Sequence, residues 1–104
     1  MWVTMNFGND IKEDDEFVEE VKRTLGITWK DDITDNNVRD YIRQGVEVLQ
    51  NDVGTSIDFE NDDIARGLLK TYCRYARNNS EEYFIENNLQ TILKLEVQYG
   101  KDKV

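Results

Sequence analysis

The chain has 104 residues, of which 38% are hydrophobic and 34% are charged, and its formal net charge at pH 7 is -9. This length corresponds to a single domain able to bury a core without a metal or a disulfide, and the composition is too apolar for a disordered chain. The acidic balance argues against nucleic-acid binding by the surface as a whole, because like charge repels the phosphates.

Three features of the composition narrow the possible fold and chemistry. The chain has no histidine, no proline and only one cysteine, Cys73. Lack of histidine removes the commonest general base and metal ligand, and lack of proline favours long helices. A single cysteine leaves no internal disulfide and suits a reducing compartment. No apolar run approaches the roughly 18 residues of a membrane span, so we expect an intracellular protein with no membrane contact.

Residues 1–13 show no sustained hydrophobic period and are expected to form a flexible arm. The first helix is predicted to begin at Asp14 or Asp15 and to stop at Gly26, because aspartate caps a helix and glycine ends one. A link over residues 27–33 follows, and its Trp29 is expected to cover the core between the first two helices. A partner-facing Trp29 is the alternative.

The second helix is predicted to start near Thr34 or Asp35 and to end at Gly54. Gly45 lies within its apolar face, where it weakens the helix by about 1 kcal/mol against alanine and suggests a close helix–helix crossing. In the acidic connection of residues 54–63, Ile57 and Phe59 are expected to tuck under the bundle.

The third helix is predicted to follow a cap at Asn61 or Asp62 and to run to Arg77. Ile64 to Ala76 carry an apolar stripe at helical spacing, which predicts a central position for this helix. After a break at residues 78–80, a fourth helix is predicted from the Ser80 cap to about Tyr99. Residues 101–104 form a charged tail. The expected fold is all-α, a small bundle of about four helices, with residues 14–100 as the domain.

No constellation of residues points to an enzyme, a cofactor or a metal. Cys73 lacks a histidine partner and is expected to be a buried, inert thiol. The acidic runs 31–35 and 58–63 lack the glycine and glutamate positions of an EF-hand loop, and helix caps explain them better. No pair of carboxylates is singled out for acid–base chemistry, so we expect no catalytic residue.

The third helix also carries a line of four cations at i, i+4, i+8 and i+11, here called the basic line: Arg66, Lys70, Arg74 and Arg77. Residues 1–63 are strongly acidic, whereas residues 64–104 are slightly basic. The basic line therefore either pairs with the acidic half of its own chain or meets another copy or DNA phosphates. In the fourth helix the apolar arc is broader than one core-facing stripe. Either the small bundle buries three sides of this helix, or part of three further residues is exposed as partner contacts: Leu93, Leu95 and Tyr99.

The run from Leu68 to Asn79, in which an aliphatic helix ends in an aromatic residue followed closely by an arginine, resembles the third-helix signature of tailed-phage head–tail connector proteins. These are also called head-completion or adaptor proteins. The order of the helices over residues 14–100 fits the same family.

The resemblance implies a structural virion protein, found at the head–tail interface and in the host cytoplasm during assembly. It implies a ring under the portal protein, with twelve subunits as a candidate number, that extends the DNA exit channel and presents a platform to the stopper or tail-completion protein. DNA would pass without sequence-specific binding. The alternative is a small acidic DNA mimic or a protein-binding regulatory module.

Overall fold

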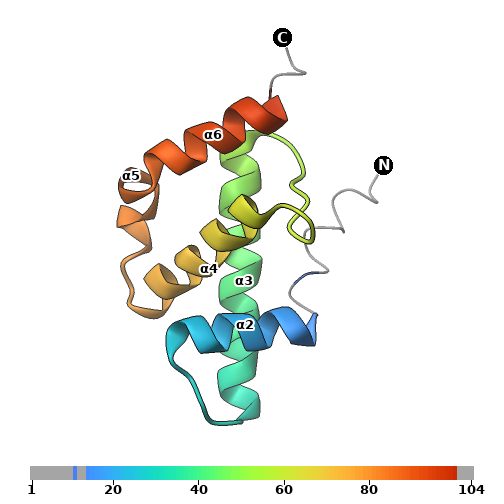
Figure 1. The fold of residues 1–104 in the computed structure, drawn as a ribbon. Coiled ribbons are helices and arrows are strands. Elements are labelled where there is room, and N and C mark those ends of the chain that lie inside the picture. Colours follow the sequence, from blue (N-terminus) through green and yellow to red (C-terminus); the bar gives the residue numbers. More distant parts are fainter. Residues whose placement is uncertain (1–10, 12–13, 101–104) are drawn as a thin grey trace.

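The computed structural model describes residue 11 and residues 14–100 of the chain (Figure 1). The predicted flexible arm, apart from Ile11, and the tail of residues 101–104 lie outside the described residues. Helices and short connections make up the described part, which contains no strand. The prediction of an all-α fold is confirmed. The elements are α2 (Asp15–Leu25), α3 (Asp32–Val53), α4 (Asp63–Arg77), the 3-10 turn η2 (Glu81–Tyr83), α5 (Phe84–Asn87) and α6 (Leu89–Gly100).

The long helix α3 is the axis of the molecule. Its 22 residues span about 33 Å, and α2, α4 and α6 pack against it one above another (Figure 1). Helix α4 lies between α2 and α6 and contacts both. The predicted central position of the third helix is thus confirmed, because α4 contacts α2, α3 and α6.

Helix ends follow the expected capping chemistry. Asp14 and Asp62 accept backbone N–H bonds at the starts of α2 and α4, and Gly26 and Gly54 end α2 and α3 in the left-handed conformation. The start of α3 differs from the prediction: the helix begins at Asp32, two to three residues early. Asp31 is the cap, because its Oδ1 accepts from the Ile33 N–H.

The core lies where α3 and α4 cross, and Gly45 permits the approach. A Cβ at this position would lie 2.6 Å from Leu69 Cδ1 and 2.9 Å from Tyr72 Cδ2, closer than real Cβ contacts come. The expected close crossing is confirmed. Ile57 and Phe59, both fully buried, also fill the core as predicted.

The predicted single fourth helix is wrong. Residues 81–99 form η2, α5 and α6 in succession, so the described residues contain five α-helices rather than about four. Phe84 is fully buried and packs edge-on against Tyr72 and Tyr75, with ring centroids 5.2 and 5.6 Å away. The Phe84 ring and the inner face of α6 can both reach the core only if the chain changes direction between them. This change of direction occurs at Asn88.

Ser80 does not act as the expected cap. Its side chain makes no bond to the N–H groups of the following turn. The Ser80 hydroxyl donates instead to the Tyr75 carbonyl at 3.3 Å, which holds the turn against the end of α4.

Candidate functional site

The basic line divides into two halves, and the first half is neutralised inside the chain. Glu20 of α2 accepts from Arg66 Nη2 at 2.8 Å and from Lys70 Nζ at 3.0 Å. Arg66 also donates to the Phe59 carbonyl, and its Cζ lies 4.7 Å from the centroid of the Phe17 ring. Arg66 and Lys70 therefore pair with the acidic half of their own chain, which was one of the two interpretations of the sequence.

Glu20 is held as an anion by these two cations. Burial by itself would raise the pKa of Glu20, but the hydrogen bonds from Lys70 and Arg66 outweigh that effect and lower the pKa. The carboxylate is thus one of the contacts that hold α2 against α4.

The second half of the basic line is free of such partners. Arg74 and Arg77 are exposed, and neither makes an ion pair within residues 14–100. Arg77 lies instead beside an aromatic ring, with its Cζ 5.9 Å from the Trp29 centroid, within the range of a cation–π contact.

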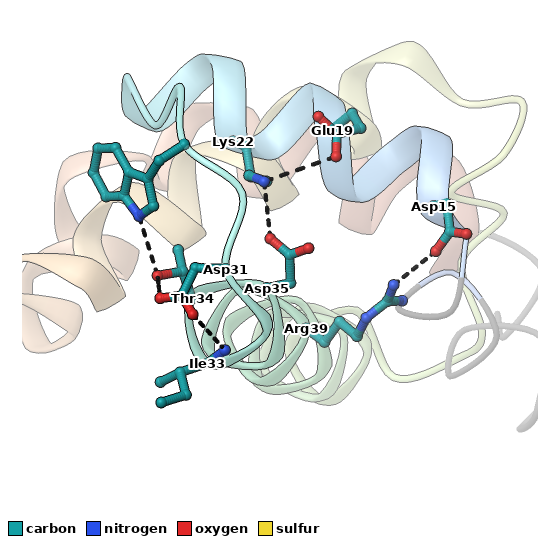
Figure 2. Close-up of polar contacts among 9 residues, drawn as sticks. Asp15, Glu19, Lys22, Asp31, Ile33, Thr34, Asp35 and Arg39 are labelled. Atoms are coloured by element: carbon teal, nitrogen blue, oxygen red, sulfur yellow. Dashed lines mark hydrogen bonds and ion pairs between the residues drawn. The ribbon is translucent and has the colours of Figure 1, made fainter.

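Trp29 does not cover the core as expected. Its side chain is 48% exposed, whereas its neighbour Ile27 is 4% exposed and fills the core in this link. The indole Nε1 donates to Thr34 Oγ1 at 3.2 Å, and this hydroxyl in turn donates to Asp31 Oδ2 at 2.9 Å. Figure 2 shows the Asp31–Thr34 contact at the first turn of α3. The indole of Trp29 is therefore fixed at the surface, beside Arg77 at the end of the basic line.

One charged pair was not found by sequence reasoning. Lys22 is 3% exposed and its Nζ lies 2.8 Å from Asp35 Oδ1, which has no other partner among the described residues (Figure 2). Hydrogen bonding to Lys22 lowers the pKa of Asp35 and, reciprocally, raises the pKa of Lys22. A signal was present: Lys22 lies four residues after Val18 and three before Leu25, on the apolar side of α2.

The predicted partner contacts of the last helix separate in the structure. Leu93 is 47% exposed, but Leu95 is fully buried in the core. Tyr99 is half-buried and its hydroxyl donates to Asp62 Oδ2 at 2.5 Å. Burial, together with that carboxylate, raises the pKa of Tyr99 to about 12. Leu95 and Tyr99 thus hold α6 in place, and only Leu93 is presented to solvent.

Two further residues join Leu93 on the surface of α6. Leu89 is 47% exposed and Val97 is 69% exposed. Together with Leu93 they follow i, i+4 and i+8, which places them within about 80° of the helix circumference. These three residues are called the α6 stripe below.

Two carboxylates of the acidic run 58–63 accept hydrogen bonds from nearby backbone N–H groups. Asp58 Oδ1 accepts from the N–H groups of Glu60 and Asn61, and Asp62 caps α4. Within the described residues no group of three or more acidic or cysteine side chains could hold a metal ion. Cys73 is buried as expected, and burial raises the pKa of its thiol to about 12. No helix in the described part of the chain is long and apolar enough to cross a membrane.

Comparison with known proteins identifies no relative: no family model, curated protein or solved structure matches the chain.

Proposed function

We propose that this chain is a structural protein that acts by binding other proteins, as a subunit of a ring that joins the head of a tailed phage or prophage to its tail. The α6 stripe is the observation that carries the proposal. The phage assignment rests in addition on the resemblance of Leu68 to Asn79 to the connector signature.

The α6 stripe has the character of a contact surface. Its three aliphatic side chains are about half exposed or more and adjoin one another on one helix. Water contact with such a continuous apolar strip is unfavourable, and a strip of this kind marks a surface that a partner covers. The remaining surface of α6 is polar, with Gln90, Lys94 and Glu96 near the strip.

In the proposed assembly the chain binds the portal protein on one side and the stopper or tail-completion protein on the other. DNA passes through the ring without sequence-specific contacts. The acidic surface suits this role, because repulsion keeps the DNA sliding. The protein would reside in the virion, at the head–tail interface.

The DNA-mimic alternative receives less support from α3. A mimic requires a continuous row of carboxylates, but on this helix Arg43 lies between Asp40 and Glu47, 4.0 and 3.5 Å from their oxygens. A second cation, Arg39, pairs with Asp15 at 2.7 Å. Cations thus interrupt the acidic face.

The experiment is to mix the purified protein with the portal protein encoded beside it and to image the complex by electron microscopy. We expect an added ring of density below the portal. Leu93→Glu/Val97→Glu should weaken binding to the portal or to the stopper at least about tenfold, because two charges are placed in an apolar contact. Ile33→Glu is the control, since Ile33 is 71% exposed on a different helix. Absence of any portal or stopper binding by the wild-type protein would contradict the proposal.

A further inference from the structure

A small hollow lies between Trp29 and Arg77, the last cation of the basic line. It has a volume of about 210 Å³ and is lined by residues from the link, α3 and α4 that include Ile27, Trp29, Thr34, Tyr41 and Arg77. This is below the roughly 300–1,000 Å³ of small-molecule sites, so the hollow suits a single protein side chain. Tryptophan, tyrosine and arginine are also the residue types enriched at the energetic centres of protein interfaces.

Cations lie in or close to this Trp29 hollow, whereas the chain as a whole is acidic. Arg77 lines the hollow and Lys30 follows Trp29 in the sequence. Arg74 lies about one turn before Arg77 in the last turn of α4. These three cations, called the rim below, are exposed, and none makes an ion pair within the described part of the chain. An acidic partner surface is therefore the complement of this rim.

The opposite end of α4 carries such a surface. Ile64 is 46% exposed at the first turn of the helix, and Glu60 and Asp63 beside it in the sequence are exposed. Neither carboxylate makes an ion pair with another described residue. Ile64 thus lies at the edge of the apolar face on which the sequence pattern placed it, and it forms an apolar knob with two acidic neighbours.

The two surfaces cannot meet within one chain. Helix α4 has 15 residues, which corresponds to a length of about 22 Å, and the knob and the hollow lie at its two ends. They can meet only between copies, in a head-to-tail contact. Contacts of this type build a ring when the rotation between copies closes, and a filament when it does not.

We propose that Ile64 of one copy, with Glu60 and Asp63, docks into the Trp29 hollow of a second copy. The isoleucine side chain contacts the indole and the apolar wall, and the two carboxylates face Arg77 and Arg74. This inference deepens the proposed function, because it assigns the subunit contact of the ring. The self-association itself is independent of the portal and can be measured on the protein alone.

The test is a reciprocal exchange of charge, followed by sedimentation velocity over a range of protein concentrations and salt. The first variant is Arg74→Glu/Arg77→Glu and the second is Glu60→Lys/Asp63→Lys. Wild type should self-associate, more weakly at high salt because salt screens the rim charges. Each variant alone should associate at least about tenfold more weakly, since like charges then face each other. An equimolar mixture of the two variants should associate again. The acidic hollow of the first variant then faces the basic knob of the second, and the basic hollow of the second faces the acidic knob of the first.

Controls separate the contact from general charge and folding effects. Lys94→Glu reverses an exposed cation of α6 that makes no ion pair with a described residue, and it should leave self-association unchanged. Trp29→Ala should weaken self-association with no change of charge. Circular dichroism establishes that each variant is folded, and Arg74→Gln/Arg77→Gln replaces the reversed pair if that pair unfolds.

Three results would overturn the inference: a wild-type protein that stays monomeric at every concentration, a mixture of the two variants that does not associate, or unchanged self-association in the folded Trp29→Ala variant. If the arginine variants associate normally but lose binding to the portal or to DNA, the hollow belongs to that other partner. If the portal experiment fails while the mixture associates, the phage assignment fails and the subunit contact stands.

Discussion

Individual carboxylates fix the positions of several cations in this protein through ion pairs. Glu20 of α2 forms ion pairs with Arg66 and Lys70 of α4. Asp35 of α3 forms an ion pair with Lys22 of α2. The pKa of both carboxylates is lowered in the folded protein from ordinary values of 4.5 and 3.8. Their stabilisation is therefore complete above the unfolded-state values and is lost as the pH falls through the folded-state pKa values.

Wild-type protein should accordingly lose stability below about pH 4.5. Glu20→Gln and Asp35→Asn should each be less stable at pH 7 and lose less stability on acidification. Urea midpoints measured from pH 7 to pH 3 test this. Glu47→Gln is the control, because its pairing with Arg43 is exposed and such pairs contribute about 0–1 kcal/mol. An acid transition as steep in both variants as in wild type would contradict the assignment.

Gly45 provides a second test on the scale of one residue. Gly45→Ala would place a methyl group against buried Leu69 and Tyr72. The overpacking should outweigh the gain in helix propensity and lower the free energy of unfolding by about 1–2 kcal/mol. Gly67→Ala is the matched control: nothing lies within 4 Å of its new Cβ, so it should raise stability by about 0.5–1 kcal/mol. Denaturant unfolding of both variants measures the difference, and a stabilised Gly45→Ala would show that the crossing is loose.

Among the elements, the first turn of α4 and the last turn of α6 are tied through one side chain. Asp62 caps α4 through the Ala65 N–H and also accepts from the Tyr99 hydroxyl and from Gln98 Nε2 at 3.0 Å. One carboxylate thus satisfies a helix terminus and anchors a second helix.

Asp62→Ala should therefore cost more than the loss of a cap alone. We expect a decrease of about 2–3 kcal/mol in the free energy of unfolding, against about 1–2 kcal/mol for Tyr99→Phe. Asp31→Ala, which removes a cap at the start of α3, should cost about 1 kcal/mol. Thermal or urea unfolding distinguishes the three. Equal losses for Asp62→Ala and Asp31→Ala would mean that the Tyr99 contact contributes nothing.

On the scale of the whole molecule, the single thiol reports on opening of the core. Cys73 is fully buried between helices, and its pKa is raised to about 12 by that burial. A thiol reagent needs both access and thiolate, so labelling should be at least about 1,000-fold slower in the native protein than in urea. Labelling followed at increasing urea should track the unfolding transition. Fast labelling of the native protein would show that α3 and α4 separate locally.

The all-α class, the ends of α2, α3 and α4 within a few residues and most of the core follow from the sequence alone. Asp14, Gly26, Gly54 and Asp62 act through local chemistry: a side chain caps nearby N–H groups, and glycine adopts the left-handed conformation that ends a helix. The apolar period of Leu68, Leu69 and Tyr72 similarly reports burial, because helix geometry places these residues on one side wherever the helix packs.

What only the tertiary structure decided is which partner each surface residue meets. Arg66 and Arg77 belong to the same basic line, yet one contacts Glu20 and the other lies beside Trp29. Helical spacing cannot separate them, because the difference arises from where α2 and the following link pass. The same holds for Leu93 and Leu95, which differ only in the side of α6 that α3 and α4 cover. Spacing along the chain determines which face a residue occupies, and packing between distant segments determines what that face contacts.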